Sequence, residues 1–323
     1  MPTPNALPEP LVRRFAEDFA RLTDAGTDDR IGIAVSGGPD SVALLLLAAA
    51  AFPGRIEAAT VDHGLRPAAT DEAKFVAELC AARGIAHSTL TLEGLPAGNI
   101  SAQARTARYA ALDKWMDAQR INWLVTAHHA DDQRETLLMR LNRGSGVSGL
   151  SSVRAIQGRI VRPLLGWRRA ELVALVAESG IIPVDDPSNR DDRYDRARIR
   201  KALASTDLLD PLAVVASTTA LADADDAIEW SVDALERDHV TERDGVVSFA
   251  SNAADFPAEY CRRIVVRCLR RVDPACKPRG DALTRLMETL AKGGVATLGN
   301  VVVRDGGSWH FSPAPPRRLT TSQ

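Results

Sequence analysis

Short strand-like runs alternate with longer amphipathic stretches along the first half of the chain. The runs at Ile31–Val35, Ile56–Val61, His87–Leu92 and Trp123–Ala127 have the length of strands. Ser41–Ala51 is apolar on nearly all sides, which predicts a buried helix. Strands that alternate with helices are typical of a parallel, doubly wound sheet. The sequence therefore predicts an α/β fold.

The other helices of this half follow from the spacing of apolar positions, and they are predicted at Thr70–Arg83, Ser101–Gln119, Asp131–Arg143 and Arg168–Ser179. A short strand-like piece ends at Pro163, and a polar, charged stretch closes this half. We expect these elements to form one large domain with bounds 1–204.

The second part of the chain differs in composition and charge. Residues 205–260 contain 13 acidic and 2 basic side chains, whereas residues 261–285 are mainly basic. Val295–Phe311 is predicted to form strands that turn at Asp305-Gly306-Gly307, and Ser312–Gln323 is predicted to be a disordered tail. We expect a smaller, mainly helical domain, residues 205–323, with a short C-terminal β segment.

Composition narrows the classes of protein. The net charge of −2 gives no global field for nucleic acid or membrane, so such partners must be inferred from local patches. The four cysteines form no CxxC pair, which favours free thiols in a reducing compartment. Because the longest apolar run is too short to span a bilayer, we expect a cytoplasmic protein that has no membrane partner.

The segment Ser36-Gly37-Gly38-Pro39-Asp40-Ser41 joins the first strand to its helix. Glycines allow close backbone approach, hydroxyls donate hydrogen bonds, and a helix N-terminus favours anionic oxygens. The segment lacks the lysine of a GxxxxGK[ST] loop and the spacing of GxGxxG. It predicts a phosphate cradle of another kind, although a plain tight turn is the structural alternative.

A second group of polar residues follows the strand that ends at Ala127. Asp132 and Glu135 share a helix face, where two carboxylates suit Mg²⁺, although aspartates also cap helices. Of the two histidines at the strand end, we favour a functional role for His128 over His129. Arg105 lies near Arg108 on one face of the helix at Ser101–Gln119, where both can neutralise phosphate charge.

Arginines are concentrated in residues 136–169, which contain seven of them and no carboxylate. Such a basic surface beside a phosphate cradle suits a nucleic-acid substrate. The few aromatic residues there give no indication of base stacking. The seven are Arg140, Arg143, Arg154, Arg159, Arg162, Arg168 and Arg169.

Ser36–Ser41 matches every fixed position of SGGxDS, and the chain thereby resembles the PP-loop ATP pyrophosphatase superfamily, whose fold is adenine-nucleotide hydrolase-like. Residues 30–203 resemble the tRNA(Ile)-lysidine synthase family more closely, because its motifs occur in the family's order. These are VDHGLR, ISAQARTARY, TAHHADDQRET, RLNRGSGVSGL, RPLL, DDPSN and YDRARIR.

The resemblance implies a ligase that acts on tRNA(Ile) with a CAU anticodon. ATP adenylates the C2 oxygen of the wobble cytidine, and L-lysine then displaces AMP to give lysidine, which switches decoding from AUG to AUA. The cofactors would be ATP and Mg²⁺. Whether the chain forms a homodimer stays open, because the sequence does not determine the oligomeric state.

The resemblance also implies roles for individual residues. Catalytic roles fall to Asp40, His128, Asp132, Glu135 and Arg105, and Mg²⁺ ligation to Asp132 and Glu135, which are alternatively assigned to lysine recognition. ATP binding falls to Ser36, Gly37, Gly38, Pro39, Asp40, Ser41, Asp62 and His63. Substrate and tRNA contacts fall to Arg108, Arg140, Arg143, Arg196 and Arg200.

Three other functions compete with this interpretation. A tRNA thiolase shares the adenylation step but needs reactive cysteines, whereas Cys80 lies within a predicted helix. A PP-loop synthetase that aminates a small molecule would not need the arginine-rich segment. A nucleotide-binding module without catalysis would not need Asp40, Asp132 and Glu135 together.

Overall fold

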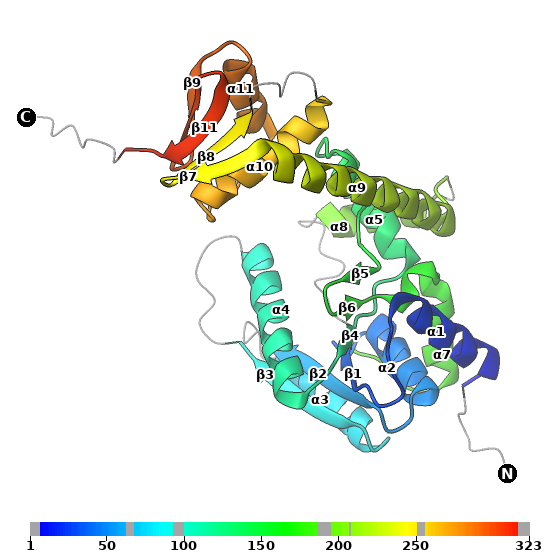
Figure 1. Cartoon of the computed structure of the whole chain (residues 1–323). Coiled ribbons are helices and arrows are strands. Elements are labelled where there is room, and N and C mark those ends of the chain that lie inside the picture. Colours follow the sequence, from blue (N-terminus) through cyan, green and yellow to red (C-terminus); the bar gives the residue numbers. More distant parts are fainter. Residues whose placement is uncertain are drawn as a thin grey trace, which may run out of the picture. The chain divides into compact units, whose positions relative to one another are not determined.

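The computed structural model describes residues 7–62, 68–92, 100–185, 195–206, 208–250, 256–278 and 280–315. Within this range the chain divides into two compact units, Met1–Ala222 and Asp223–Gln323, and the boundary falls inside one long helix, α9 (Pro211–His239). Figure 1 shows the elements of both units. The expected boundary at residue 204 stays a prediction.

The first unit contains a six-stranded sheet. Its strands are β1 (Ile31–Ala34), β2 (Ile56–Asp62), β3 (Ala86–Thr91), β4 (Trp123–Val125), β5 (Ile156–Gln157) and β6 (Ile160–Val161). They lie in the order β3-β2-β1-β4-β6-β5, and only β5 is antiparallel to its neighbour. The mostly parallel, doubly wound sheet that the sequence predicts is therefore confirmed.

The helices of the first unit include all those that the sequence predicts. They are α1 (Glu9–Leu22), α2 (Pro39–Ala51), α3 (Ala68–Ala81), α4 (Ile100–Gln119), α5 (Ala130–Leu141), α6 (Val147–Leu150), α7 (Arg169–Glu178) and α8 (Asp195–Ala204), with a 3₁₀ turn at Pro163–Gly166. No helix was predicted at α1. Its buried Phe15 and Phe19 belong to the core.

Alternate residues of the central strands face two separate hydrophobic clusters. Ile31 and Ile33 of β1 pack with α1, α2, α3 and α7 on one face of the sheet. Ala34 packs with Leu112 and Trp115 of α4 on the other face. This is the alternation expected of a strand buried on both sides. Helices α2 and α4 therefore lie on opposite faces.

The order of the strands reverses beside β1. The chain runs outward from β1 through β2 to β3 and then returns to place β4 on the other side of β1. At such a switch point the loops after the two neighbouring strands diverge, and ligands of doubly wound folds bind in the crevice between them. The loop Ser36–Ser41 follows β1, and His128 follows β4 soon after its last residue.

The second unit contains a five-stranded antiparallel sheet in the order β7-β8-β11-β10-β9. Its elements are β7 (Val240–Arg243), β8 (Val246–Ala250), α10 (Ala258–Val272), α11 (Gly280–Leu290), β9 (Val295–Leu298), β10 (Val301–Asp305) and β11 (Ser308–Pro313). The turn at Asp305-Gly306-Gly307 is confirmed. No strand was predicted at β7 or β8, and Ser312, which was predicted to belong to the tail, pairs with Val302.

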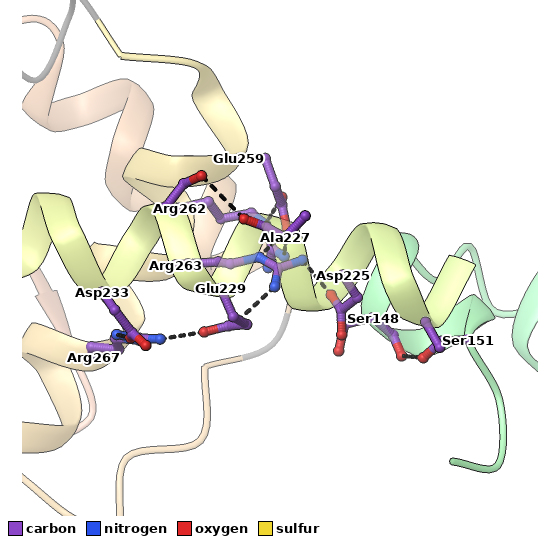
Figure 2. A network of polar contacts seen from close by, with 12 residues as sticks. Ser148, Ser151, Asp225, Ala227, Glu229, Asp233, Glu259, Arg262, Arg263 and Arg267 are labelled. Atoms are coloured by element: carbon purple, nitrogen blue, oxygen red, sulfur yellow. Dashed lines mark hydrogen bonds and ion pairs between the residues drawn. The ribbon is translucent and has the colours of Figure 1, made fainter. Parts of the chain in front are cut away.

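The acidic and basic blocks of the second unit neutralise each other (Figure 2). Arg263 of α10 is 6% exposed and contacts Asp225 at 2.6 Å, Glu229 at 2.5 Å and Glu259 at 2.8 Å. Arg267 pairs with Glu229, and its distance to Asp233 is 2.6 Å. The acidic and basic blocks that adjoin in the sequence therefore form ion pairs between α9 and α10.

Candidate active site

The loop Ser36–Ser41 is held by its own hydroxyl groups. Ser41 Oγ donates to the carbonyl of Gly38 at 2.9 Å and accepts from the backbone N–H of Ser36 at 3.1 Å. Helix α2 begins at Pro39, and its N-cap Gly38 provides no side-chain cap. The first N–H groups of α2 therefore lack a side-chain acceptor, which is the arrangement that receives a phosphate oxygen.

Gly37 has a backbone conformation that favours glycine, with φ of 86°. Its carbonyl accepts from the N–H of Val184 at 2.9 Å. A Cβ atom at Gly37 would lie 3.2 Å from Val184 Cγ2. The segment after α7 therefore packs directly on the loop, a contact that the sequence did not reveal.

His129 lies at the centre of the carboxylates near the loop. The side chain is 1% exposed, and its Nε2 is 3.5 Å from Asp40 Oδ2 and 3.6 Å from Asp132 Oδ2. Its backbone N–H donates to Asp132 Oδ2 at 3.1 Å. The structure thus brings the loop after β1 and the start of α5 together through His129, whereas the sequence favoured a functional role for His128.

The charges in this cluster favour ionised Asp40 and protonated His129. Burial opposes ionisation of Asp40, but its hydrogen bond to His129 and the charges of His129 and Arg169 outweigh burial and lower its pKa. Burial likewise opposes protonation of His129, and the carboxylates of Asp40 and Asp132 outweigh it and raise its pKa. Asp40 Oδ1 is buried and has no hydrogen-bond partner. Arg169 Nε lies 3.6 Å from that oxygen, so a cation or a donor on a ligand would have to displace Arg169 to reach it.

Asp132 and Glu135 bind two arginines of α8. Arg196 donates to Asp132 Oδ1 at 2.5 Å and to Glu135 Oε2 at 2.7 Å. Arg200 donates to Glu135 Oε1 at 2.7 Å and to Oε2 at 3.1 Å. Burial opposes ionisation of Glu135, and the two arginines outweigh it and lower its pKa. Four residues predicted from separate motifs therefore form one cluster.

His128 is half-buried beside this cluster. Its Nδ1 lies 2.9 Å from Thr126 Oγ1, within hydrogen-bond distance. Burial lowers the pKa of His128 to about 3, and nearby arginines add to the effect while Asp132 opposes it. The ring is therefore neutral at physiological pH, so hydrogen bonding suits it better than proton transfer.

Asp62, which was predicted to bind ATP, is the last residue of β2. Asp62 is 9% exposed, and Thr70 lies 3.5 Å from its carboxylate. His63 lies outside the described residues, so its expected role stays a prediction. Arg169, which the sequence analysis assigned only to the basic segment, lies with Nε 3.6 Å from Asp40 Oδ1.

The arginine-rich segment 136–169 is not one solvent-facing patch. Arg159 pairs with Asp117 at 2.6 Å, and Arg162 is 1% exposed and donates to a backbone carbonyl at 2.7 Å. Arg140 and Arg143 are exposed at the end of α5, where Arg143 lies 3.2 Å from Asp195. Only part of the segment is therefore placed to contact a large substrate.

Two kinds of feature were not found among the described residues, namely a cluster of metal ligands and a membrane-spanning helix. In the described part of the chain, no group of three or more histidine, cysteine or acidic side chains has the arrangement of a metal site. Within the same ranges, none of the helices has the length and apolar character needed to cross a bilayer. The four cysteines are buried and form no disulfide, and burial raises the pKa of Cys80 to about 11, so it is not a reactive thiolate.

Comparison with solved structures identifies a similar fold. The U34-tRNA thiolase NcsA from Methanococcus maripaludis superimposes with a TM-score of 0.54 at 16% sequence identity, covering 66% of this chain and 80% of that chain. At this identity the likeness concerns the fold alone.

Comparison with families and curated proteins is more specific. The PP-loop domain family matches residues 11–206. A tRNA(Ile)-lysidine synthase from Novosphingobium aromaticivorans is 46% identical over 94% of this chain and 94% of its own length. Another from Zymomonas mobilis is 38% identical over 96% of each. With its loop, its carboxylate cluster and these relatives along nearly its whole length, the chain belongs to the PP-loop family and, within it, to the tRNA(Ile)-lysidine synthase family.

Proposed function

We propose that this chain is an ATP-dependent ligase that converts the wobble cytidine of CAU-anticodon tRNA(Ile) to lysidine. The proposal rests mainly on one observation: Asp40 of the loop and Asp132 of α5 both lie within 3.6 Å of His129, so the two motifs form one site. Relatives named tRNA(Ile)-lysidine synthase cover almost the whole chain, which supports the same substrate.

The reaction has two steps in this proposal. The C2 oxygen of the cytidine attacks the α-phosphorus of ATP, and the bond to the departing pyrophosphate breaks. The amino nitrogen of lysine then bonds to C2, AMP leaves with the C2 oxygen, and the amine loses a proton. The loop Ser36–Ser41 holds the pyrophosphate part through backbone N–H groups at the start of α2.

Lysine recognition is proposed for Asp132, Glu135, Arg196 and Arg200. Lysine carries ammonium groups and a carboxylate, and this cluster provides carboxylates and guanidinium groups in alternation. An entering amino acid can exchange these internal ion pairs for its own. Glu135, whose side chain is 3% exposed, provides the most buried charge of the cluster.

Mg²⁺ at Asp132 and Glu135 would require both arginines to move, because the carboxylate oxygens of the two residues accept hydrogen bonds from Arg196, Arg200 or the His129 backbone. A cation at Asp40 Oδ1 would displace only Arg169, because this oxygen accepts no hydrogen bond and Arg169 Nε lies 3.6 Å from it. Mg²⁺ bound there with the phosphates of ATP would neutralise negative charge. His128 is assigned to hydrogen bonding with the substrate through Nε2.

One assay tests the function. Purified protein is incubated with ATP, Mg²⁺, labelled lysine and a CAU-anticodon tRNA(Ile) transcript, and label in the RNA is measured. A transcript with the wobble cytidine replaced by uridine is the matched control. Label in the control, or none in either RNA, refutes the proposal. An RNA-independent cleavage of ATP would favour amination of a small molecule instead.

The exposed arginines at the end of α5 are proposed tRNA contacts. Arg140→Ala and Arg143→Ala are expected to weaken tRNA binding and to reduce the slope of log Kd against log salt by about 0.7 to 0.9 per lost phosphate contact. An unchanged slope would exclude phosphate contacts by these residues.

A further inference from the structure

Tyr109 of α4 carries two guanidinium groups over its ring. Arg105 Cζ lies 5.1 Å from the ring centroid and Arg108 Cζ lies 5.9 Å from it. Arg105 is exposed, and Arg108 and Tyr109 are half-buried. An aromatic face attracts a cation within about 6 Å, so the ring fixes the positions of both charges.

A third arginine, Arg162, lies near the hydroxyl of Tyr109. Arg162, just after β6, is 1% exposed and donates to the carbonyl of Arg154 at 2.7 Å and to Gln157 Oε1 at 3.2 Å. It lies close enough to Tyr109 to interact with the hydroxyl, although neither that hydroxyl nor Arg162 Nε has a hydrogen-bond partner of good geometry. Arg162 is therefore held in place by backbone and amide oxygens, with its charge beside the ring.

These three charges differ from the other arginine clusters of the chain. Arg196 and Arg200 pair with buried carboxylates, and Arg263 contacts carboxylates on two helices. Arg105, Arg108 and Arg162 make no ion pair with any carboxylate of the described residues. Burial lowers the pKa of Arg108 and of Arg162, and the charge of Arg105 adds to both effects. Like charges gathered in a partly buried place repel, and a bound anion relieves the repulsion.

We propose that Arg105 and Arg108, held on the ring of Tyr109 with Arg162 near its hydroxyl, form a binding site for a backbone phosphate of the RNA substrate. Arg105 and Arg108 contact the phosphate, whereas Tyr109 and Arg162 are positioning residues. This inference rests on the proposed function, because it takes tRNA to be the substrate.

The position of the cluster favours an RNA phosphate over the phosphates of ATP. The pyrophosphate loop opens α2, which packs on the face of the sheet formed by Ile31 and Ile33. Helix α4 packs on the opposite face, which includes Ala34. Burial lowers the pKa of His128, and the charges of Arg162 and Arg105 add to this effect, so the cluster lies near the end of β4 at the switch point. The loop holds the one triphosphate of ATP, whereas an RNA strand that presents its base at the switch point has further phosphates on either side.

The test is a matched pair of substitutions at Tyr109. Tyr109→Leu removes the aromatic ring, and Tyr109→Phe keeps the ring while it removes the hydroxyl. We expect the leucine variant to raise the Kd for a CAU-anticodon transcript by about 3- to 10-fold, since it loses two cation–π contacts. It should also reduce the slope of log Kd against log salt by about 0.7 to 0.9. The phenylalanine variant should bind within about twofold of the unsubstituted protein.

Further variants separate positioning from folding. Arg162→Gln removes the charge near the Tyr109 hydroxyl and should weaken RNA binding. Arg159→Gln in the same arginine-rich segment should not, because Arg159 pairs with Asp117. If Tyr109→Leu fails to fold, Arg108→Gln replaces it, since Arg108 makes no ion pair with a carboxylate of the described residues. The KM for ATP is measured for every variant and is expected to stay unchanged.

Two results overturn the inference. RNA affinity and salt slope that are unchanged in both Tyr109→Leu and Arg108→Gln would show that the cluster does not bind RNA. A raised KM for ATP with unchanged RNA affinity would assign the cluster to a phosphate of the nucleotide. Because RNA affinity and the salt slope are binding measurements, they are read independently of lysidine formation, whereas the KM for ATP is measured on active protein. A protein that passes them but never incorporates lysine contradicts the proposed function alone.

Discussion

Replacing Gly37 with alanine should damage the loop through two separate costs. Its φ of 86° lies in the left-handed region, where a residue with a Cβ atom loses about 1–2 kcal/mol. The new Cβ would also lie 3.2 Å from Val184 Cγ2, and such crowding costs about 1–3 kcal/mol. Gly37→Ala is therefore expected to lower the free energy of unfolding by roughly 2–5 kcal/mol.

A second glycine separates the two costs. Gly54 has φ of 74°, and a Cβ atom there would meet nothing within 4 Å. Gly54→Ala should therefore lose only the backbone term of about 1–2 kcal/mol. Adding Val184→Ala to Gly37→Ala removes the crowding and should recover part of the difference.

The assay is urea unfolding of each variant, with ATP affinity measured on the folded protein. Gly37→Ala should raise the Kd for ATP by on the order of tenfold, because a shifted loop moves the N–H groups at the start of α2 away from the phosphates. Gly54→Ala should leave ATP affinity unchanged. If Gly37→Ala costs no more than Gly54→Ala, Val184 does not limit the space at the loop and the reasoning is wrong.

Three further predictions concern buried charges. Glu135→Gln should raise the KM for lysine by on the order of tenfold or more, because Arg196 loses its charged partner at 2.7 Å. Burial lowers the pKa of His128 to about 3, below its value in the unfolded chain, so the unfolded state binds the proton first. Its contribution to stability is present above about pH 6.5 and is lost as the pH falls toward 3, a dependence that His128→Gln should lack in urea unfolding. Arg263→Met should lower the free energy of unfolding by about 3–5 kcal/mol, because Asp225 stays buried without its partner at 2.6 Å.

Each of these predictions has a control or a contrary outcome. Arg262→Met should change stability by less than about 1 kcal/mol, since Arg262 is 42% exposed. If Arg262→Met and Arg263→Met lowered the free energy of unfolding by similar amounts, burial would not explain how much an ion pair contributes to stability. An unchanged KM for lysine in Glu135→Gln would remove Glu135 from lysine recognition. A His128→Gln variant that loses stability over the same acidic range would assign that loss to other groups.

The order of the elements could be predicted because each strand and helix has its own local signal. Ile31–Val35 is followed, after Ser36, by paired glycines, and the apolar run Ser41–Ala51 has the length of a buried helix. The structure confirms the doubly wound sheet and the loop between β1 and α2. Because the carboxyl ends of parallel strands share one edge of a sheet, this topology also brings Asp40 and Asp132 to the same histidine.

Contacts between distant segments could not be predicted in the same way. Val184 follows the loop by more than a hundred residues, and nothing in its neighbours indicates that its N–H donates to Gly37. The preference for His128 over His129 used position alone, whereas burial and the distance to Asp40 make His129 the histidine of the carboxylate cluster.

The sequence by itself determined the fold class, the loop and the residue types available for chemistry, because these depend on local periodicity and on short motifs. The tertiary structure decided which charges are neutralised. Arg159 and Arg263 are engaged in ion pairs, whereas Arg105 and Arg108 share an aromatic ring without a carboxylate in the described residues. Pairing of charges depends on distances of a few ångströms between segments that are remote in sequence, and only the folded chain sets those distances.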